Sequence, residues 1–369
     1  MTEETRRRKA DHLRIALNRN VQARQVTTGL EDVHLLHKAL PEIDKNNVDL
    51  SAAVFGHKFA APLVVGAITG GIEEALRINA SLAEAAEELG LGMGVGSQRA
   101  AIEDRKLEKT FAVARKKAPT AFLIANIGGI QLVNGYGLRE VRKAIKMIEA
   151  DAIAIHMNAL QEAVQPEGQT NFKGVLEKIR EITGEIDKPV IAKETGAGIS
   201  AEEARMLEEA GVRGIDVGGA GGTSFAAVEY YRAKGHENSY QRKLGDTFWD
   251  WGIPTAVSIV ETSMKTEMCI IGSGGLRSGL DVAKALALGA NLTSLSYPML
   301  KAASKNARET KAALSLLIDE LRNTMFLVGA DSVEALRKAP AVIMGRTAEW
   351  LTARGFDVSA KAQGRIDCV

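Results

Sequence analysis

The stretch Asp151-Ala-Ile-Ala-Ile-His-Met-Asn-Ala-Leu-Gln-Glu162 indicates both the fold and the site of this chain. Its first half is an apolar, strand-like run, and its second half carries an imidazole, two carboxamides and a carboxylate. Alternation along an extended backbone sends His156 and Asn158 to one face, and we expect Gln161 and Glu162 in the following loop. Buried polar groups need partners. Four together therefore indicate either a ligand site or a solvated network at a strand end.

Apolar runs of this kind recur eight times from residue 62 onward, each ending in glycine or polar residues. The runs are Pro62–Thr69, Leu91–Ser97, Ala121–Asn126, Ala152–Asn158, Pro189–Lys193, Gly214–Val217, Cys269–Gly272 and Leu292–Tyr297. Amphipathic helices are predicted between them, including Glu73–Leu89, Leu138–Ile148, Ala201–Ala210 and Leu280–Leu288. Continuously apolar strands indicate a parallel sheet buried on both faces. Eight alternations favour an α/β fold of the (β/α)8 TIM barrel type over an open doubly wound sheet.

The rest of the chain is assigned to the ends of this barrel. We expect residues 1–61 to form an N-terminal arm with helices, and residues 62–369 to form the barrel with C-terminal helices, as a single domain overall. The interval from Thr223 to Met268 is too long for a simple connection, so a lid or extra helices are predicted there.

Composition excludes several classes of protein. The chain has 369 residues with 47 Lys plus Arg against 46 Asp plus Glu, so net charge does not point to nucleic acid or a membrane surface. Cys269 and Cys368 provide neither a disulfide framework nor paired metal ligands. No apolar segment approaches the ~18 residues of a membrane span, and the start lacks the apolar core of a signal peptide. A soluble, cytoplasmic protein is expected.

In a TIM barrel the active site lies at the C-terminal ends of the strands, so the residues that close each run are predicted to share one mouth. After strand seven, the glycine-rich stretch Gly272–Gly279 leads into a helix, and the backbone N–H groups and helix dipole there suit phosphate. Ser296 and Tyr297 close strand eight and are expected to supply further contacts. Lys193 closes strand five, where a buried charge needs a partner, such as an anionic flavin edge or a carbonyl that forms a Schiff base.

These motifs together resemble the family of type 2, flavin-dependent isopentenyl diphosphate isomerases, over nearly the whole chain. The matching segments are Arg8–His12, Thr69–Gly71, Gly96–Arg99, His156–Asn158 with Gln161–Glu162, Ala192–Glu194, Gly221–Thr223, Gly272–Gly275 and Ser296–Pro298. The pattern His-x-Asn-x-x-Gln-Glu, combined with the basic N-terminal arm, is the discriminating part. Flavin phosphate loops alone occur in many FMN barrels.

The resemblance implies a barrel that binds FMN and interconverts isopentenyl and dimethylallyl diphosphate with reduced flavin, Mg2+ and NADPH as reductant. It places the FMN on Ala67, Ile68, Thr69, Ser97, Asn126, Lys193, Thr223, Gly274, Gly275, Arg277, Ser296 and Tyr297. It places the substrate on Arg8, Lys9, Arg99, His156, Asn158 and Gln161, and the metal on Glu162. It also suggests a homotetramer or homo-octamer.

We hypothesise that reduced FMN is the proton donor and acceptor, with Gln161 and His156 as the candidate catalytic side chains. Gln161 would orient the alkene or relay a proton. The sequence leaves open whether Gln161 shares the proton transfers, which of Arg6, Arg7 and Arg8 contacts the diphosphate, and what His12 does.

Three other interpretations compete. An FMN-dependent 2-hydroxy-acid oxidoreductase needs a histidine base and paired arginines near the end of strand six, and Gly218–Ser224 contains neither. A barrel like inosine monophosphate dehydrogenase needs a nucleophilic cysteine after a glycine-rich loop, whereas Cys269 begins a strand. A non-catalytic phosphate-binding barrel would have no reason to combine Lys193, Gln161 and Glu162.

Overall fold

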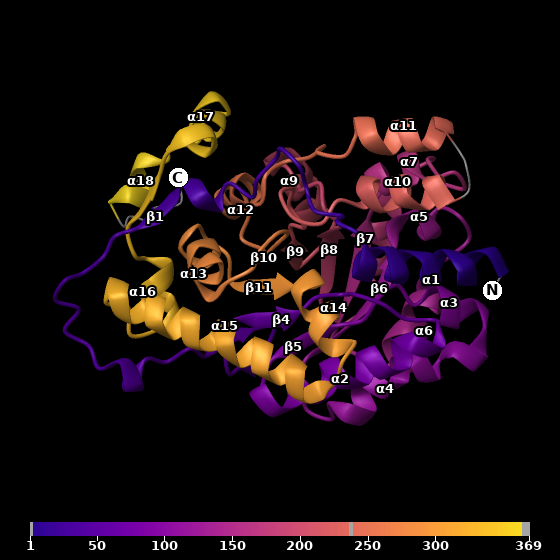
Figure 1. The fold of residues 1–369 in the computed structure, drawn as a ribbon, viewed down its shortest axis with the longest axis horizontal. Coiled ribbons are helices and arrows are strands. Elements are labelled where there is room, and N and C mark those ends of the chain that lie inside the picture. Colours follow the sequence, from indigo (N-terminus) through magenta and orange to yellow (C-terminus); the bar gives the residue numbers. More distant parts are fainter. Residues whose placement is uncertain (1–2, 236–238, 364–369) are drawn as a thin grey trace.

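The predicted barrel is present in a computed structural model of the chain, which describes residues 3–235 and 239–363. Eight parallel strands follow one another in chain order around a closed barrel, and β11 pairs back to β4 (Figure 1). The strands are β4 Leu63–Val65, β5 Gly92–Gly94, β6 Leu123–Gly128, β7 Ala152–Met157, β8 Val190–Glu194, β9 Gly214–Asp216, β10 Cys269–Ser273 and β11 Leu292–Leu295. Each overlaps one predicted run, so the predicted fold class is confirmed.

Aromatic and branched side chains fill the N-terminal end of the barrel. A hairpin of β2 (Ala52–Val54) and β3 (His57–Phe59) closes this end. Phe59 is fully buried there, and its ring centroid lies 5.4 Å from that of Phe122. Ile124 and Ile191 belong to the same apolar cluster. Burial of this surface stabilises the closed barrel and leaves the opposite, C-terminal end for a site.

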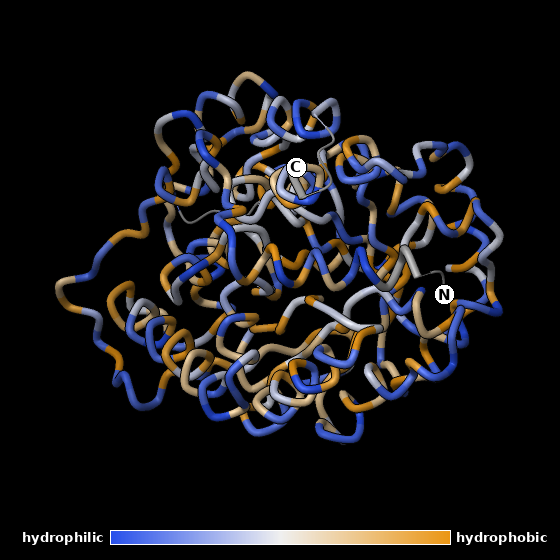
Figure 2. Tube along the Cα trace, turned by 45° about the vertical axis from the view of Figure 1, so that its right-hand side comes forward, coloured by the Kyte–Doolittle hydropathy of each residue, from blue (hydrophilic) through white to orange (hydrophobic). Residues whose placement is uncertain are grey.

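Helices surround the strands, and they alternate hydrophobic and hydrophilic residues along their length, as Figure 2 shows. The surrounding helices are α2 Glu73–Leu89, α3 Arg99–Glu103, η3 Arg105–Leu107, α4 Lys109–Lys117, α5 Gly129–Leu132, α6 Leu138–Met147, α7 Ala159–Val164, α8 Val175–Thr183, α9 Ala201–Glu209 and α13 Gly279–Ala287. Ser200 begins α9 with a capping box in which its hydroxyl accepts from the Glu203 N–H, a signal that the sequence carries. The four predicted helices are confirmed. Within the described ranges, no helix is both long enough and apolar enough to span a membrane.

The N-terminal arm lies over the barrel mouth. Its helix α1 (Glu3–Asn18) packs against α10 (Phe225–Gly235), as Figure 1 shows. Ile15 and Val21 from the arm share an apolar cluster with Val228 and Trp249. α11 (Ser239–Thr247) and α12 (Thr255–Ser263) follow α10, so the extra helices expected between strands six and seven are present.

The C-terminal segment contains helices and one strand that the sequence did not predict. The helices are α14 Tyr297–Ala303, α15 Ala307–Val328, α16 Val333–Arg337, α17 Gly345–Ala353 and α18 Ser359–Ala362. The strand β12 (Ala341–Ile343) pairs antiparallel with β1 (Val33–Leu35). This pairing connects the C-terminal segment to the N-terminal segment that precedes the barrel. Between β1 and β2 and just before β1 lie two short helical turns, η2 Lys45–Asn47 and η1 Leu30–Asp32.

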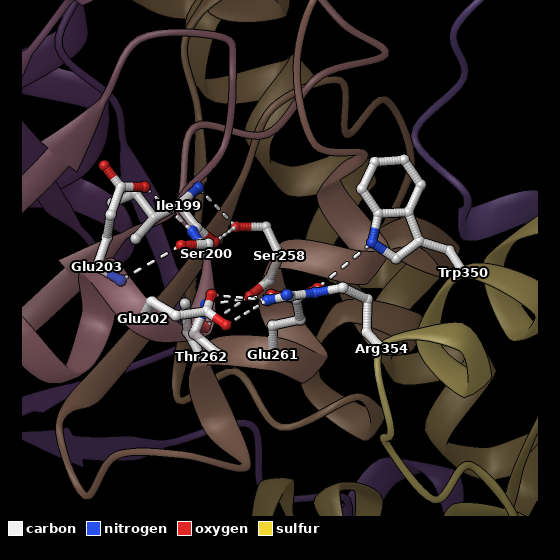
Figure 3. A network of polar contacts seen from close by, with 10 residues as sticks. Ile199, Ser200, Glu202, Glu203, Ser258, Glu261, Thr262, Trp350 and Arg354 are labelled. Atoms are coloured by element: carbon white, nitrogen blue, oxygen red, sulfur yellow. Dashed lines mark hydrogen bonds and ion pairs between the residues drawn. The ribbon is translucent and has the colours of Figure 1, made fainter.

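Arg354 fastens this C-terminal segment to the barrel. Its guanidinium contacts Glu202 of α9 and the buried Glu261 of α12, with an Arg354 Nη2 to Glu261 Oε2 distance of 3.0 Å (Figure 3). The Trp350 indole also donates to Glu261. Together with the Ala201 N–H, which donates to Glu261 Oε2 at 3.1 Å, these bonds satisfy a buried carboxylate whose charge would be costly without a cation beside it.

Cys269 is the first residue of β10. Burial raises the pKa of its thiol to about 12. The thiol is therefore protonated near neutral pH and a poor nucleophile, which disfavours the dehydrogenase that uses a cysteine nucleophile. Cys368 lies outside the described residues.

Candidate active site

One pocket at the C-terminal ends of the strands gathers all the residues predicted for FMN, substrate and metal. These residues come from segments as far apart in the sequence as Arg8 in α1 and Tyr297 in α14. The barrel brings them together because the carboxyl ends of parallel strands meet at one rim.

Glycine backbone forms the end of the pocket between β9 and β10. Gly274 has φ +100°, and a Cβ there would overlap the carbonyl oxygen of Gly219. A Cβ at Gly222 would overlap the backbone of Gly275 in the same way. The two loops therefore approach as closely as glycine permits, which leaves a cradle walled by main chain that fits a flavin phosphate.

Two N–H groups at the start of α13 are not free for phosphate, contrary to a simple reading of the sequence. Asp281 Oδ2 accepts from the backbone N–H of Arg277 at 2.9 Å and of Ser278 at 3.0 Å. The Arg277 guanidinium, held by the Gln22 side chain, instead supplies positive charge at this end. Burial lowers the pKa of Arg277, and guanidinium nevertheless stays charged in proteins.

Lys193 has a protein partner, which the sequence did not reveal. Its Nζ lies 2.8 Å from Oδ2 of Asp216, the residue beside it on β9. Asp216 Oδ1 accepts in turn from the Ser273 hydroxyl of β10, which accepts from the Gly218 N–H at 2.9 Å. The charge of Lys193 is therefore compensated within the barrel, and neither a flavin anion nor a Schiff base is needed for that purpose.

His156 is a neutral hydrogen-bonding group. Its Nδ1 lies 2.7 Å from Asn126 Oδ1, and Asn126 Nδ2 donates to the Val95 carbonyl. This orientation of the amide assigns the imidazole proton to Nδ1 and leaves Nε2 as an acceptor. Burial, with the nearby charges of Lys193 and Lys9, lowers the pKa of His156 to about 4, so the ring carries no charge near neutral pH.

Cationic side chains form the end of the pocket beneath α1. Lys9 Nζ donates to the carbonyl oxygens of Gly70 at 3.0 Å and Ser97 at 2.8 Å. Burial, followed by the charges of Arg8 and Arg99, lowers the pKa of Lys9 to about 7. Three neighbouring cations of this kind are costly without an anion, so the arrangement suits a multiply charged ligand.

The structure bears on which arginine of the arm faces the pocket and on the role of His12. Of the described side chains Arg7 and Arg8, Arg8 lines the pocket, whereas the side chain of Arg6 lies outside the described residues. His12 Nε2 lies 2.8 Å from Oε1 of the buried Glu229, which also pairs with Arg232. His12 therefore fastens α1 to α10, although it also lines the pocket.

Glu162 lies in helix α7, so the prediction that Gln161 and Glu162 lie in a loop was wrong. Its Oε1 accepts from Asn158 Nδ2 at 3.0 Å, and its Oε2 accepts from Gln165 Nε2 at 3.3 Å and from the Gln169 N–H at 2.7 Å. Helical spacing aligns Asn158, Glu162 and Gln165 on one face.

Two buried oxygens beside this carboxylate have no protein partner: Asn158 Oδ1 and Gln165 Oε1. Such acceptors suit water molecules held by a divalent cation, which donate outward. Among the described residues, no three His, Cys, Asp or Glu side chains cluster as a ready metal cage. The site therefore fits a cation that takes the remainder of its ligands from water and a bound anion, as Mg2+ commonly does.

Glu194 is an acidic group of the pocket that the sequence analysis missed. Its Oε2 accepts from the N–H groups of Thr195 and Gly196, each at 2.6 Å, and from that of Ala197. Burial outweighs these bonds and raises its pKa to about 7. Its place directly after Lys193 was the available signal.

The sequence is similar to those of known proteins. Residues 137–343 match the family model for FMN-dependent dehydrogenase. The isopentenyl-diphosphate delta-isomerase of Methanosarcina barkeri is 49% identical over 358 residues, 97% of this chain and 97% of the relative. That of Pyrococcus abyssi is 50% identical over 99% of this chain and 100% of the relative. The chain belongs to the isopentenyl-diphosphate delta-isomerase family.

Solved structures of other proteins share the fold of this chain. A mandelate oxidase variant with an FMN adduct superimposes with a TM-score of 0.57 at 22% identity, over 90% of this chain and 92% of that chain. A second variant gives a TM-score of 0.61 at 19% identity, over 93% and 98%. At such identities the likeness shows the TIM barrel alone, and the loop Val217–Ser224 lacks the histidine and arginines that the oxidase interpretation required.

Proposed function

We propose that this chain interconverts isopentenyl diphosphate and dimethylallyl diphosphate, without net oxidation or reduction. The observation that carries the proposal is the meeting of two half-sites in one pocket: a glycine-walled flavin cradle, and a group of cations beside the hydrogen-bonded carboxylate of Glu162. The family membership supports the same activity.

The cationic end would hold the diphosphate. Arg8, Lys9 and Arg99 line it, and Arg99 contacts Glu103 Oε1 through Nε, which leaves its two terminal nitrogens for a ligand. Guanidinium groups bind phosphate through paired hydrogen bonds. Glu162 would hold Mg2+ together with the diphosphate oxygens, with the orphaned amide oxygens of Asn158 and Gln165 accepting from the waters of the cation.

The other end would hold FMN on the predicted set of residues, and that cofactor supplies an acid–base group and an electron-rich ring beside the alkene. The barrel excludes bulk water from the reacting carbons and orients them. Gln161 Oε1 accepts from Asn158 Nδ2 at 3.3 Å, so the Gln161 NH2 group would be left to orient the alkene or to take part in a proton relay as a donor. His156 Nε2 would accept a hydrogen bond from the bound ligand.

We further propose NADPH as the reductant of the flavin, a homotetramer or homo-octamer, and a cytoplasmic location. These proposals rest on the resemblance to the type 2 family.

The test is an anaerobic assay of purified protein with isopentenyl diphosphate, FMN and Mg2+, with and without dithionite or NADPH. Product that appears only with reduced flavin, and disappears when EDTA removes the metal, is the expected result. Absence of product while FMN stays bound would overturn the proposal. Oxidation of lactate or glycolate by the same sample would then identify the FMN-dependent 2-hydroxy-acid oxidoreductase.

A further inference from the structure

Asp216 lies behind Lys193 as seen from the pocket. Lys193 lines the pocket and also a small space beneath it inside the barrel, and Asp216 lines that lower space together with Asn126. Asp216 thus reaches a ligand in the pocket through Lys193. Its Oδ2 lies 2.8 Å from the Lys193 ammonium.

The carboxylate is held in place by a third strand. The Ser273 hydroxyl of β10 donates to Asp216 Oδ1 and accepts from the Gly218 N–H. Ser273 and Asp216 are both almost fully buried. A buried, hydrogen-bonded ion pair spanning three strands has a fixed geometry, so the charge that Lys193 presents to the pocket is compensated at a constant distance.

Among the described residues, none of the other charged or titratable side chains that line the pocket forms an ion pair with Lys193. They are Arg8, Lys9, His12, Arg99, His156, Glu162, Glu194, Arg277 and Tyr297. His156, next to Lys193 on β7, is neutral near pH 7. Glu194 has a pKa that burial raises to about 7 and that the Lys193 charge lowers only in part, and its carboxyl group is bound by the N–H groups of its own loop. The other acidic side chain, Glu162, accepts hydrogen bonds from Asn158 and Gln165.

We propose that Asp216 is a positioning residue that sets, through Lys193, the positive charge offered to bound reduced FMN, and thereby the protonation state of that cofactor. The inference rests on the proposed function. A flavin that must give and accept protons works best when it titrates near the operating pH. An uncompensated ammonium would favour the deprotonated cofactor, and the neutral Lys193–Asp216 pair prevents this.

The test is a spectroscopic pH titration of bound, dithionite-reduced FMN in the wild type, Asp216→Asn, and the double variant Lys193→Met with Asp216→Asn. Asp216→Asn should lower the apparent pKa of the reduced flavin by roughly one unit or more, the usual effect of one unpaired charge at short range. It should also lower kcat about tenfold with little change in the KM for isopentenyl diphosphate.

The double variant protects the test against misfolding, because replacing both members of a buried pair is tolerated better than breaking it. It carries no unpaired charge, so the lowering seen in Asp216→Asn should disappear and its reduced flavin should titrate at or above the wild-type value. A double variant that keeps the lowered value, or an unshifted value in a folded Asp216→Asn protein, would overturn the inference. Wild-type protein that binds FMN but makes no dimethylallyl diphosphate would instead refute the proposed function, and the titration would still be decided.

Discussion

The pocket has two ends that are built differently. The cradle between β9 and β10 is formed mainly by main chain, and the cationic end beneath α1 is formed by side chains. Main chain walls the cradle, at Gly219, Gly274 and Gly275. Long side chains, Lys9 and Arg99 among them, line the other end. A wall of main chain has no titrating group and no rotamers to order, whereas a wall of cations depends on pH and on an opposing anion. We therefore expect the cradle to fail through shape and the cationic end to fail through charge.

The two ends also differ in how far their parts are separated along the chain. Gly274 and Gly275 directly follow strand β10, whereas Lys9 reaches the barrel because α1 docks on α10 and α14. Lys9 then donates to the carbonyl oxygens of Gly70 and Ser97, in the loops that follow β4 and β5. Docking of the arm is thus a condition for diphosphate binding but not for the shape of the cradle.

The largest effect is expected from a methyl group in the cradle. Gly274→Ala would force a φ of +100° on alanine and overlap the Gly219 carbonyl, so FMN affinity should fall by about 100-fold or more, roughly 2.8 kcal/mol. Gly135→Ala is the matched control, since its φ is +96° but nothing lies within 4 Å of the added methyl group. Fluorescence titration of FMN measures both. Unchanged affinity in Gly274→Ala would refute the view that shape governs this end.

An intermediate effect is expected from a charge at the other end. Arg99→Ala should raise the KM for isopentenyl diphosphate by about 10- to 100-fold, because hydrogen bonds to charged groups contribute roughly 1.5–3 kcal/mol. FMN affinity should change less than about twofold. Arg105→Ala, at a side chain that is 90% exposed, is the control. Equal losses of flavin and substrate affinity would show that the two ends are not separable.

The smallest expected effect is the uptake of a proton by Lys9 when an anion binds. In the free protein burial lowers the pKa of Lys9 to about 7, so at pH 8 the amine is mostly neutral, and a bound anion should recharge it. Pyrophosphate binding at pH 8 should then take up on the order of one proton per site more in the wild type than in Lys9→Met, measured by calorimetry in two buffers of different ionisation enthalpy. Lys109→Met, at an exposed side chain, should behave like the wild type. Equal proton uptake in the wild type and Lys9→Met would contradict the assignment.

The lowered pKa of Lys9 also determines how its contribution to folding stability changes with pH. Because the folded pKa of Lys9 lies below its usual 10.5, the unfolded chain binds more protons between pH 7 and 10.5. The contribution of Lys9 to folding stability therefore rises with pH across that window.

By itself the sequence determined the barrel, because eight apolar runs that end in glycine or polar residues and alternate with helices are typical of a parallel sheet buried on both faces. It also predicted many of the residues that line the mouth, since strand ends share one rim, but it missed Glu194. The division of the chain near residue 61 stays a prediction.

Only the tertiary structure decided which groups pair. Asp216 meets Lys193 across two strands, Gln165 turns toward Glu162, and His12 reaches Glu229 of α10. Each pairing depends on strand register or helix docking rather than on local pattern. The electrostatic state of the pocket follows from these pairings and from burial, because the pKa of a side chain is set by its distance to water and to other charges. That distance is a property of the folded chain.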